Sequence, residues 1–243
     1  MKNEKKKITG VQEWACKSVN IQYGCENNCT YCYAKKMAAR FGRIPTLGWD
    51  HPILKIERPL LPRNTTVMFP STHDITPNNL TMAIQCINIL LSRGNRVLIV
   101  SKPRIECING IMENNNIANN RDRIEFRFTI GDWAEFDENR LEYEPNAPTM
   151  QERFICAKST SYCFKYKTSI SMEPLLQTDI SWVEEMVACF ESWGITEIWL
   201  GAMQYTKDAP KLDYAQLYET FRVDPRIKFK ESFRKHLKEN LIC

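Results

Sequence analysis

Apolar and polar positions along the chain predict six short strands separated by helices or turns. The segment at 96–101, Arg-Val-Leu-Ile-Val-Ser, is almost continuously apolar, as in a strand that is buried on both faces. The segment at 18–23 alternates instead, as in a strand with one buried face. Similar runs complete a set of six predicted strands: 18–23, 65–70, 96–101, 124–130, 166–171 and 195–200.

Helix signals lie between these strands. Helix-forming residues fill 33–41, and Pro77 opens a helix that runs to about Ser92. We also expect a short helix at 104–114 and two helices that begin with capping boxes, Thr149-Met-Gln-Glu152 and Ser181-Trp-Val-Glu184. Four prolines and polar turns make 43–64 a predicted loop. Six alternating units are two short of a closed eightfold barrel, so the pattern predicts an open partial (βα)6 barrel of parallel strands with outer helices.

The predicted barrel sets the domain organisation. We expect a flexible N-terminal lead at 1–17, the partial barrel at 18–210, and a helical, amphipathic closing element at 211–243. A chain of 243 residues with 43% hydrophobic and 26% charged positions has the size and composition of one folded domain. It contains no apolar run near 18 residues and no signal-peptide pattern, so we expect a cytoplasmic protein without a membrane partner. The net charge of +4 permits a nucleic-acid partner without requiring one.

Three of the ten cysteines lie in one short stretch, Gly-Cys-Glu-Asn-Asn-Cys-Thr-Tyr-Cys-Tyr-Ala at 24–34. This C-x3-C-x2-C spacing gathers three thiolates, which are the ligands of iron-sulfur clusters. Three ligands for four irons leave one iron open, and an open metal position normally binds a reactant. The alternative is a structural zinc site completed by Cys16 or His51, although such sites usually need two C-x2-C halves and the sequence contains one.

The spacing, with Tyr31 before the last cysteine, resembles the signature of the radical S-adenosylmethionine (SAM) enzymes. The resemblance implies a [4Fe-4S] cluster held by Cys25, Cys29 and Cys32, with SAM as its partner and Tyr31 at the cofactor site. It also implies that SAM is cleaved reductively to methionine and a 5′-deoxyadenosyl radical. The electron would come from an external donor of the flavodoxin or ferredoxin type. An open six-stranded barrel is the fold expected of this family.

Polar residues follow each predicted strand, where parallel α/β folds bind their ligands. Lys102 is positioned to supply a cation for the carboxylate of SAM, whereas Asp74, Thr129 and Glu173 are candidates for its ribose hydroxyls. His73 is a candidate hydrogen-bonding contact to SAM, a general acid or base, or a structural residue.

Several short segments within roughly 20–205 are similar to the spore photoproduct lyase group and to small phage-associated radical SAM proteins. By this resemblance Asp74, Lys102 and Thr129 contact SAM. One departure concerns Pro70, which stands where the lyase has a hydrogen-donating cysteine. The segments that carry the resemblance are Ser71-Thr-His-Asp74, Val100-Ser-Lys102, Phe126-Arg-Phe-Thr-Ile130, and Glu144-Pro-Asn-Ala-Pro-Thr149 leading to Glu152-Arg153.

These resemblances indicate a radical SAM enzyme that acts on a nucleic-acid base or nucleotide. Modification of a peptide or small metabolite is the second hypothesis. It ranks lower because the chain lacks the cysteine-rich extension that peptide-modifying relatives often carry. A third hypothesis, of another class, is a non-catalytic zinc or iron-sulfur module that binds nucleic acid.

Overall fold

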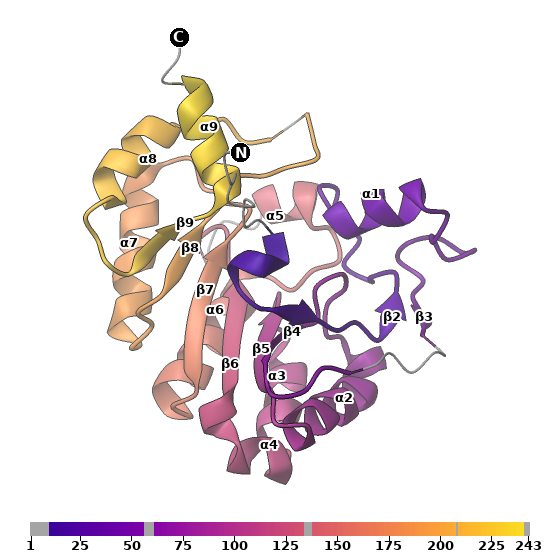
Figure 1. Ribbon diagram of the computed structural model, residues 1–243. Helices are drawn as coiled ribbons and strands as arrows, with labels where there is room; N and C mark the ends of the chain where they lie inside the picture. The colour runs from indigo at the N-terminus through magenta and orange to yellow at the C-terminus, as the bar shows by residue number, and fades with distance from the viewer. Residues whose placement is uncertain (1–9, 56–60, 134–137, 208, 241–243) are drawn as a thin grey trace, which may run out of the picture.

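The computed structural model describes residues 10–55, 61–133, 138–207 and 209–240. Its centre is a curled sheet of seven strands in the order β1-β4-β5-β6-β7-β8-β9, and every neighbouring pair is parallel (Figure 1). The edge strands β1 and β9 do not pair with each other in this described part, so the barrel is open. The predicted α/β partial barrel is therefore confirmed, with one strand more than expected. The strands are β1 Lys17–Ser18, β4 Thr66–Phe69, β5 Arg96–Ser101, β6 Ile124–Thr129, β7 Lys167–Met172, β8 Ile198–Leu200 and β9 Ile227–Phe229.

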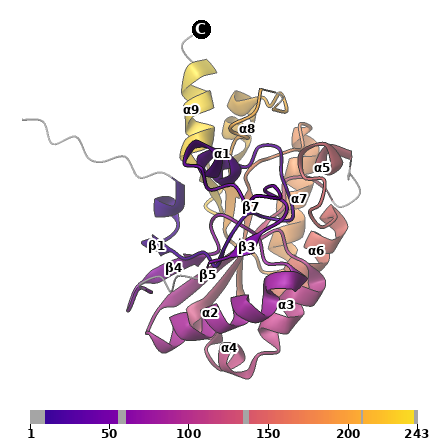
Figure 2. The same ribbon diagram turned by 90° about the vertical axis from the view of Figure 1, so that its right-hand side faces the viewer.

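Helices cover the outer face of the sheet and surround one of its ends (Figures 1 and 2). The helices between neighbouring strands of the large sheet are α2 Leu80–Ser92, α3 Ile105–Met112, α4 Asn115–Asn119, α5 Glu138–Tyr143, α6 Met150–Lys158, α7 Ile180–Ser192 and α8 Tyr214–Phe221. α1 Tyr33–Arg40 follows the cysteine segment, and α9 Glu231–Asn240 follows β9. Short helical turns are η1 Gly10–Glu13, η2 Pro77–Asn79, η3 Arg121–Arg123 and the π-helical η4 Ser159–Cys163. No helix of the described ranges has the length and apolar character that crossing a membrane requires.

The core lies between the sheet and its outer helices. Apolar side chains of β4 to β8 pack against α2, α3, α6 and α7, and many of them are completely buried. Burying each large apolar side chain contributes about 1.5–3 kcal/mol, so this layer supplies most of the driving force for folding. Its fully buried members include Phe69, Ile87, Leu90, Ile99, Ile111, Phe126, Phe128, Ile170, Phe190 and Leu200.

The first predicted strand is interrupted, because the chain leaves the sheet at Asn20. The side-chain oxygen of Asn20 accepts hydrogen bonds from the backbone amides of Ser71 and Thr72, at 2.7 and 2.9 Å. After this turn β2 (Gln22–Tyr23) pairs antiparallel with β3 (Ile53–Leu54), in a small second sheet. The loop predicted at 43–64 thus contains a short strand, and the turn delivers the chain to the cysteine segment.

Two helix starts test the capping predictions. The Thr149 side chain accepts the backbone amide of Glu152 at 3.1 Å and caps α6, which is one half of the predicted capping box, while the Glu152 carboxylate accepts the amide of Ile105 at 2.9 Å instead. In α7 the cap is Asp179, which accepts the amide of Ser181, so the prediction that Ser181 itself begins the helix was wrong. An aspartate directly before the apolar face competes successfully with the serine two positions later.

Both ends of the chain differ from the sequence pattern. The lead predicted at 1–17 falls partly on residues 1–9, outside the described residues, while Gly10–Glu13 forms η1. At the other end, α8 and α9 agree with the helices expected at 211–243, but β9 runs between them and pairs with β8. Three residues are too few to show a strand period beside two amphipathic helices.

Candidate active site

The cysteine segment follows β2 and is shaped by two backbone positions. Gly24 has a φ of +91°, and a side chain there would come within 2.7 Å of the carbonyl oxygen of Trp49. Only glycine fits this position, directly before Cys25. Asn28 also adopts a positive φ, 46°, and its amide donates to the carbonyl oxygen of Cys25 at 3.2 Å. These turns bring the thiols of Cys25, Cys29 and Cys32 to one cavity.

The thiols line a cavity of about 190 Å³. Burial raises the pKa of Cys25 and of Cys29 to about 12, so both are protonated at neutral pH unless a positive group joins them. Iron is such a group, because a coordinating thiol loses its proton. Cys32 stands apart as the N-cap of α1, where its sulfur accepts the amide of Lys35 at 3.4 Å.

The donor set fits a multi-iron cluster better than a single metal ion. Within the described ranges, no three His, Cys, Asp or Glu side chains are grouped closely enough to hold one ion. A cluster takes each thiolate on a different iron, so its ligands stand further apart than those of one zinc. Cys16 and His51, the candidates for completing a zinc site, are exposed and do not line this cavity. The loop therefore offers three ligands, as an open-site cluster requires.

Asp74 lies beside the cysteine cavity and is fully engaged by hydrogen bonds. One carboxylate oxygen accepts the amide of Ile75 at 2.8 Å and the hydroxyl of Ser101. The other accepts the side-chain amide of Asn27 and the backbone amide of Lys102, both at 2.9 Å. Asp74 thus ties the cysteine loop to the ends of β4 and β5, and its acceptor positions are occupied.

His73 also has both ring nitrogens in use. Its Nε2 accepts the backbone amide of Ile21 at 3.2 Å, and its Nδ1 lies 2.9 Å from the carbonyl oxygen of Asp74. Burial lowers the pKa of His73 to about 4, so the ring is neutral. This geometry favours the structural interpretation of His73 among the three that the sequence left open.

Lys102 belongs to a buried charge network. Its Nζ lies 3.6 Å from a carboxylate oxygen of Glu144 and 5.6 Å from the centre of the Tyr31 ring. Glu144 also accepts hydrogen bonds from the Tyr31 hydroxyl and from the Arg153 guanidinium, and both Glu144 and Arg153 are about 1% exposed or less. The segment that contains Glu144 and Arg153 carries part of the sequence resemblance, but the sequence assigns neither residue a role. Their short loop and helix positions carried no sign that they meet beneath Tyr31.

A second cavity, of about 790 Å³, adjoins the first and fills the end of the barrel. Tyr31, Ser71 and Thr129 are among the residues that line both, so the two spaces share a wall. Ser171 at the end of β7 is 1% exposed and lines the larger cavity, and its hydroxyl has no hydrogen-bond partner among the residues that the structure describes. A buried hydroxyl without a partner costs free energy, which a polar ligand group would recover.

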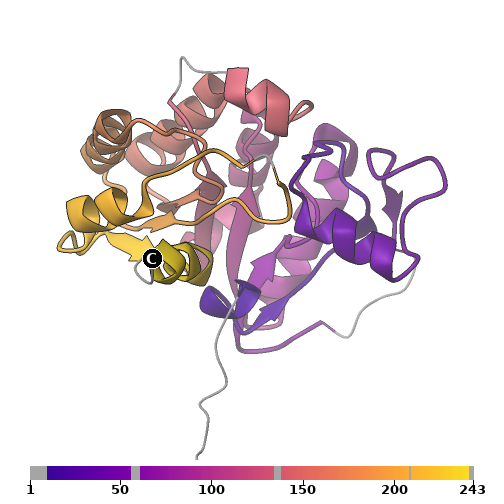
Figure 3. The ribbon, with the colours of Figure 1, turned by 90° about the horizontal axis from the view of Figure 1, so that it is seen from above.

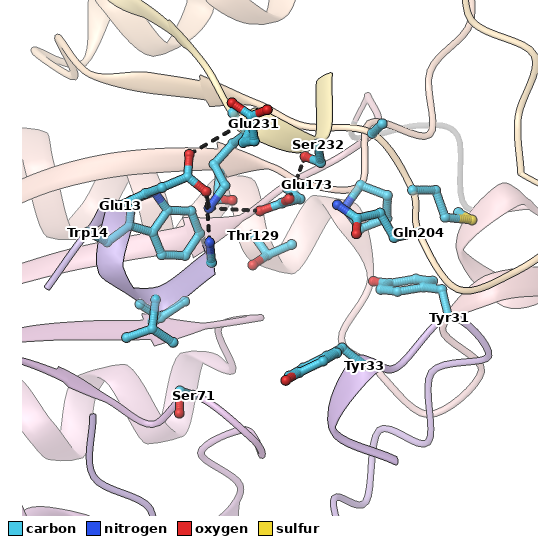
Figure 4. A pocket seen from close by; sticks show the side chains of 18 of the residues that line it. Glu13, Trp14, Tyr31, Tyr33, Ser71, Thr129, Glu173, Gln204, Glu231 and Ser232 are labelled. Atoms are coloured by element: carbon cyan, nitrogen blue, oxygen red, sulfur yellow. Dashed lines mark hydrogen bonds and ion pairs between the residues drawn. The ribbon is translucent and has the colours of Figure 1, made fainter. Parts of the chain in front are cut away.

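Glu173 lies on the wall of the larger cavity that is opposite Tyr31 and Tyr33 (Figure 4). It accepts the hydroxyl of Ser232 at 2.7 Å, and its other oxygen lies 3.4 Å from the Nζ of Lys230. Lys230 also lies 3.2 Å from Glu13 and 3.8 Å from the centre of the Trp14 ring. Sequence reasoning placed Glu173 at the cofactor and missed Lys230 and Glu13. Glu13 lies in the predicted lead and Lys230 in the predicted closing element. Nothing in the sequence indicates that these distant residues meet in the folded chain.

The sequence-predicted residues thus divide between the two cavities. Cys25, Cys29, Cys32, His73, Asp74 and Lys102 line the smaller one, Glu173 lines the larger one, and Tyr31 and Thr129 line both.

Comparison with known proteins identifies the fold. No family model and no curated protein matches the sequence. Among solved structures, Streptococcus suis SuiB bound to S-adenosylmethionine superposes with a TM-score of 0.50 at 12% identity, over 88% of this chain and 45% of the SuiB chain. SuiB alone gives 0.51 at 10% identity, over 88% and 48%, and SuiB bound to precursor peptide SuiA gives 0.51 at 11% identity, over 91% and 50%. The chain spans about half the length of SuiB, and over that half it has the partial α/β barrel fold of a protein that binds SAM.

Proposed function

We propose that this protein is a radical SAM enzyme that binds a [4Fe-4S] cluster through Cys25, Cys29 and Cys32. The observation that carries the proposal is the arrangement of three thiols around one small cavity that shares a wall with a larger one. The SAM-bound SuiB fold supports the same function, as does the C-x3-C-x2-C spacing.

The cluster, when bound, supplies the electron that cleaves SAM to methionine and a 5′-deoxyadenosyl radical. The chain's own residues position the reactants around that event. Lys102, held between Glu144 and the Tyr31 ring, places a positive charge at the cavity for a carboxylate. Thr129 brings a hydroxyl to the shared wall, and Asp74 keeps the cysteine loop against the strand ends. Enclosure in the barrel limits the access of water to a reactive intermediate.

The first test uses anaerobically reconstituted protein. Iron and sulfide are measured, then the 5′-deoxyadenosine formed from SAM with dithionite as reductant. We expect four irons and four sulfides per chain and SAM-derived 5′-deoxyadenosine, with both lost in Cys29→Ala and retained in the buried-cysteine control Cys86→Ala. Zinc without sulfide would indicate instead the non-catalytic module. Cleavage that is undiminished in Cys29→Ala would refute the assignment.

For the substrate, we propose a nucleic-acid base or nucleotide. The lyase-like segments, the net charge of +4 and a cavity large enough for a nucleoside support this class. The protein is incubated with SAM, dithionite and oligonucleotides, and base modification is followed by mass spectrometry of the digested strands. SuiB in complex with its precursor peptide supports the second candidate, peptide modification, so a peptide pool is tested in parallel. Modification of peptides alone would overturn the nucleic-acid assignment.

The proposal includes a cytoplasmic location and an electron donor of the flavodoxin or ferredoxin type. Both follow from the need to reduce an oxygen-sensitive cluster in a reducing compartment. Reduced flavodoxin replacing dithionite in the cleavage assay tests the donor.

A further inference from the structure

The mouth of the larger cavity carries two exposed aromatic rings. Tyr33 begins α1 and Tyr205 follows β8, yet their ring centres lie 5.3 Å apart and both residues line the cavity. The two are 50% and 46% exposed, so the rings remain open to a ligand. Exposed tyrosines that pair at a cavity entrance offer flat faces on which a base can stack.

Basic side chains extend from this pair along α1. The Nζ of Lys36 lies 5.9 Å from the centre of the Tyr205 ring. Tyr33, Lys36 and Arg40 are spaced at i, i+3 and i+7, which places them on one face of the helix. Lys36 and Arg40 are both exposed. This face of α1 is therefore a basic stripe that begins at the aromatic pair.

A second basic stripe stands across the mouth on α9. Glu231 and Lys235 line the cavity, and Lys238 lies one turn further along the same face. Lys235 and Lys238 are exposed. Figure 3 looks down on this end of the molecule and shows α1 and α9 on either side, with the segment after β8 between them. Lys207 in that segment is also exposed.

Carboxylates also line the cavity, beside Lys230 and Lys235. Its lining includes the carboxylates of Glu13, Glu173 and Glu231, with Lys230 held between the first two. The exposed basic side chains of α1 and α9 therefore attract a polyanion to the mouth, whereas the paired charges of the lining offer it little. A nucleic-acid strand matches this arrangement, because it offers phosphates to the basic side chains and a base to the tyrosines, whereas a polyglutamate peptide offers the charge without a ring to stack.

We infer that this basic and aromatic mouth binds single-stranded nucleic acid. The strand's phosphates lie along Lys36 and Arg40 on α1 and Lys235 and Lys238 on α9, and one base stacks on Tyr33 and Tyr205. The inference rests on the proposed function for its biological meaning, since it names how the substrate reaches the same cavity. Binding itself requires no SAM cleavage, so the two can fail separately.

The test is fluorescence anisotropy of short, labelled single strands of DNA and RNA with the reconstituted holoprotein, between about 50 and 200 mM NaCl. We expect log K to fall linearly with log salt, and the double variant Lys36→Gln/Arg40→Gln to flatten this slope by about 1.4, at about 0.7 per phosphate contact. Tyr33→Ala and Tyr205→Ala should each weaken binding about 5- to 100-fold.

Matched controls remove the same groups elsewhere. Lys158→Gln/Lys167→Gln deletes two exposed lysines at the opposite end of the barrel, and Tyr162→Ala deletes a tyrosine that is 54% exposed. These controls should leave the slope, the affinity and 5′-deoxyadenosine formation unchanged. Equal losses in the test and control variants would overturn the inference. Competition by a polyglutamate peptide as effective as that of the oligonucleotide would overturn it too, and would assign the mouth to acidic peptides. Cys29→Ala separates the two proposals, because it should abolish SAM cleavage whether or not strands bind.

Discussion

Protonation of His73 should destabilise the fold in mildly acidic solution. The neutral ring accepts the amide of Ile21 at Nε2 and places Nδ1 against the carbonyl oxygen of Asp74. A protonated ring has a hydrogen on both nitrogens, so the Ile21 amide would face another donor. Burial, with a smaller contribution from the charge of Lys55, accordingly lowers the pKa of His73 from 6.5 to about 4, although the hydrogen bond to Asp74 opposes it.

The sign and size of the effect follow from this difference in pKa. Between pH 6.5 and 4 the unfolded chain binds the proton and the folded chain does not, so acid favours unfolding. The stability that the neutral ring preserves above pH 6.5 is lost as the pH falls through this window. At pH 5 the loss is about 2 kcal/mol, at about 1.36 kcal/mol for each unit of pKa difference.

The assay is anaerobic urea unfolding at pH 7.5 and pH 5.0 of proteins with equal cluster content. Wild type should lose about 2 kcal/mol more than His73→Gln between the two pH values. His51→Gln replaces an exposed histidine and should retain the wild-type difference. An equal pH dependence in wild type and His73→Gln would show that the ring is not held neutral, and would refute the reasoning.

The other predictions concern buried carboxylates near the cysteine loop. Glu144→Ala leaves the Arg153 guanidinium buried without its partner, and urea unfolding should show a loss of about 3–5 kcal/mol, against little change for the exposed Glu184→Ala. Near-wild-type stability of Glu144→Ala would mean that water or another anion replaces the carboxylate. Asp74→Ala frees the cysteine loop from the strand ends and should lower iron retention against a chelator by about 10- to 100-fold, whereas Asp179→Ala, a helix cap elsewhere, should not. Equal retention in both would exclude Asp74 as a positioning residue.

The sequence predicted much of the barrel because its strands are buried on both faces. The run at 96–101 is mostly apolar, so it predicts a buried strand whatever elements pack against it. The cysteine site could also be predicted, because its three proposed ligands lie within eight consecutive residues, 25–32. Lys102 was found because it directly follows β5, and Asp74 because it lies in the short segment after β4, although the partners of Asp74 could not be anticipated from its position.

The parts that were missed depend on contacts between distant segments. β9 has three residues, and only pairing with β8 makes it a strand. In the sequence Glu144 looks like an ordinary loop carboxylate. Only the folded chain brings Tyr31, Lys102 and Arg153 into contact with it. No local pattern distinguishes such residues from solvated charges, because their burial is created by the tertiary fold.

The contact between Glu13 and the Lys230–Glu231 segment has a consequence for how the molecule is made. Glu13 accepts the backbone amide of Glu231 at 3.2 Å, across 218 positions of sequence. Such a loop costs little more entropy to close than a shorter one, but it closes late, because nearly all of the chain must be present. During synthesis from the N-terminus, the sheet from β1 to β8 can assemble before the part of the cavity wall at residues 230–235 has been made. Lys230 and Glu231 therefore join the wall of the larger cavity only after the segment that carries the cysteine loop has been synthesised.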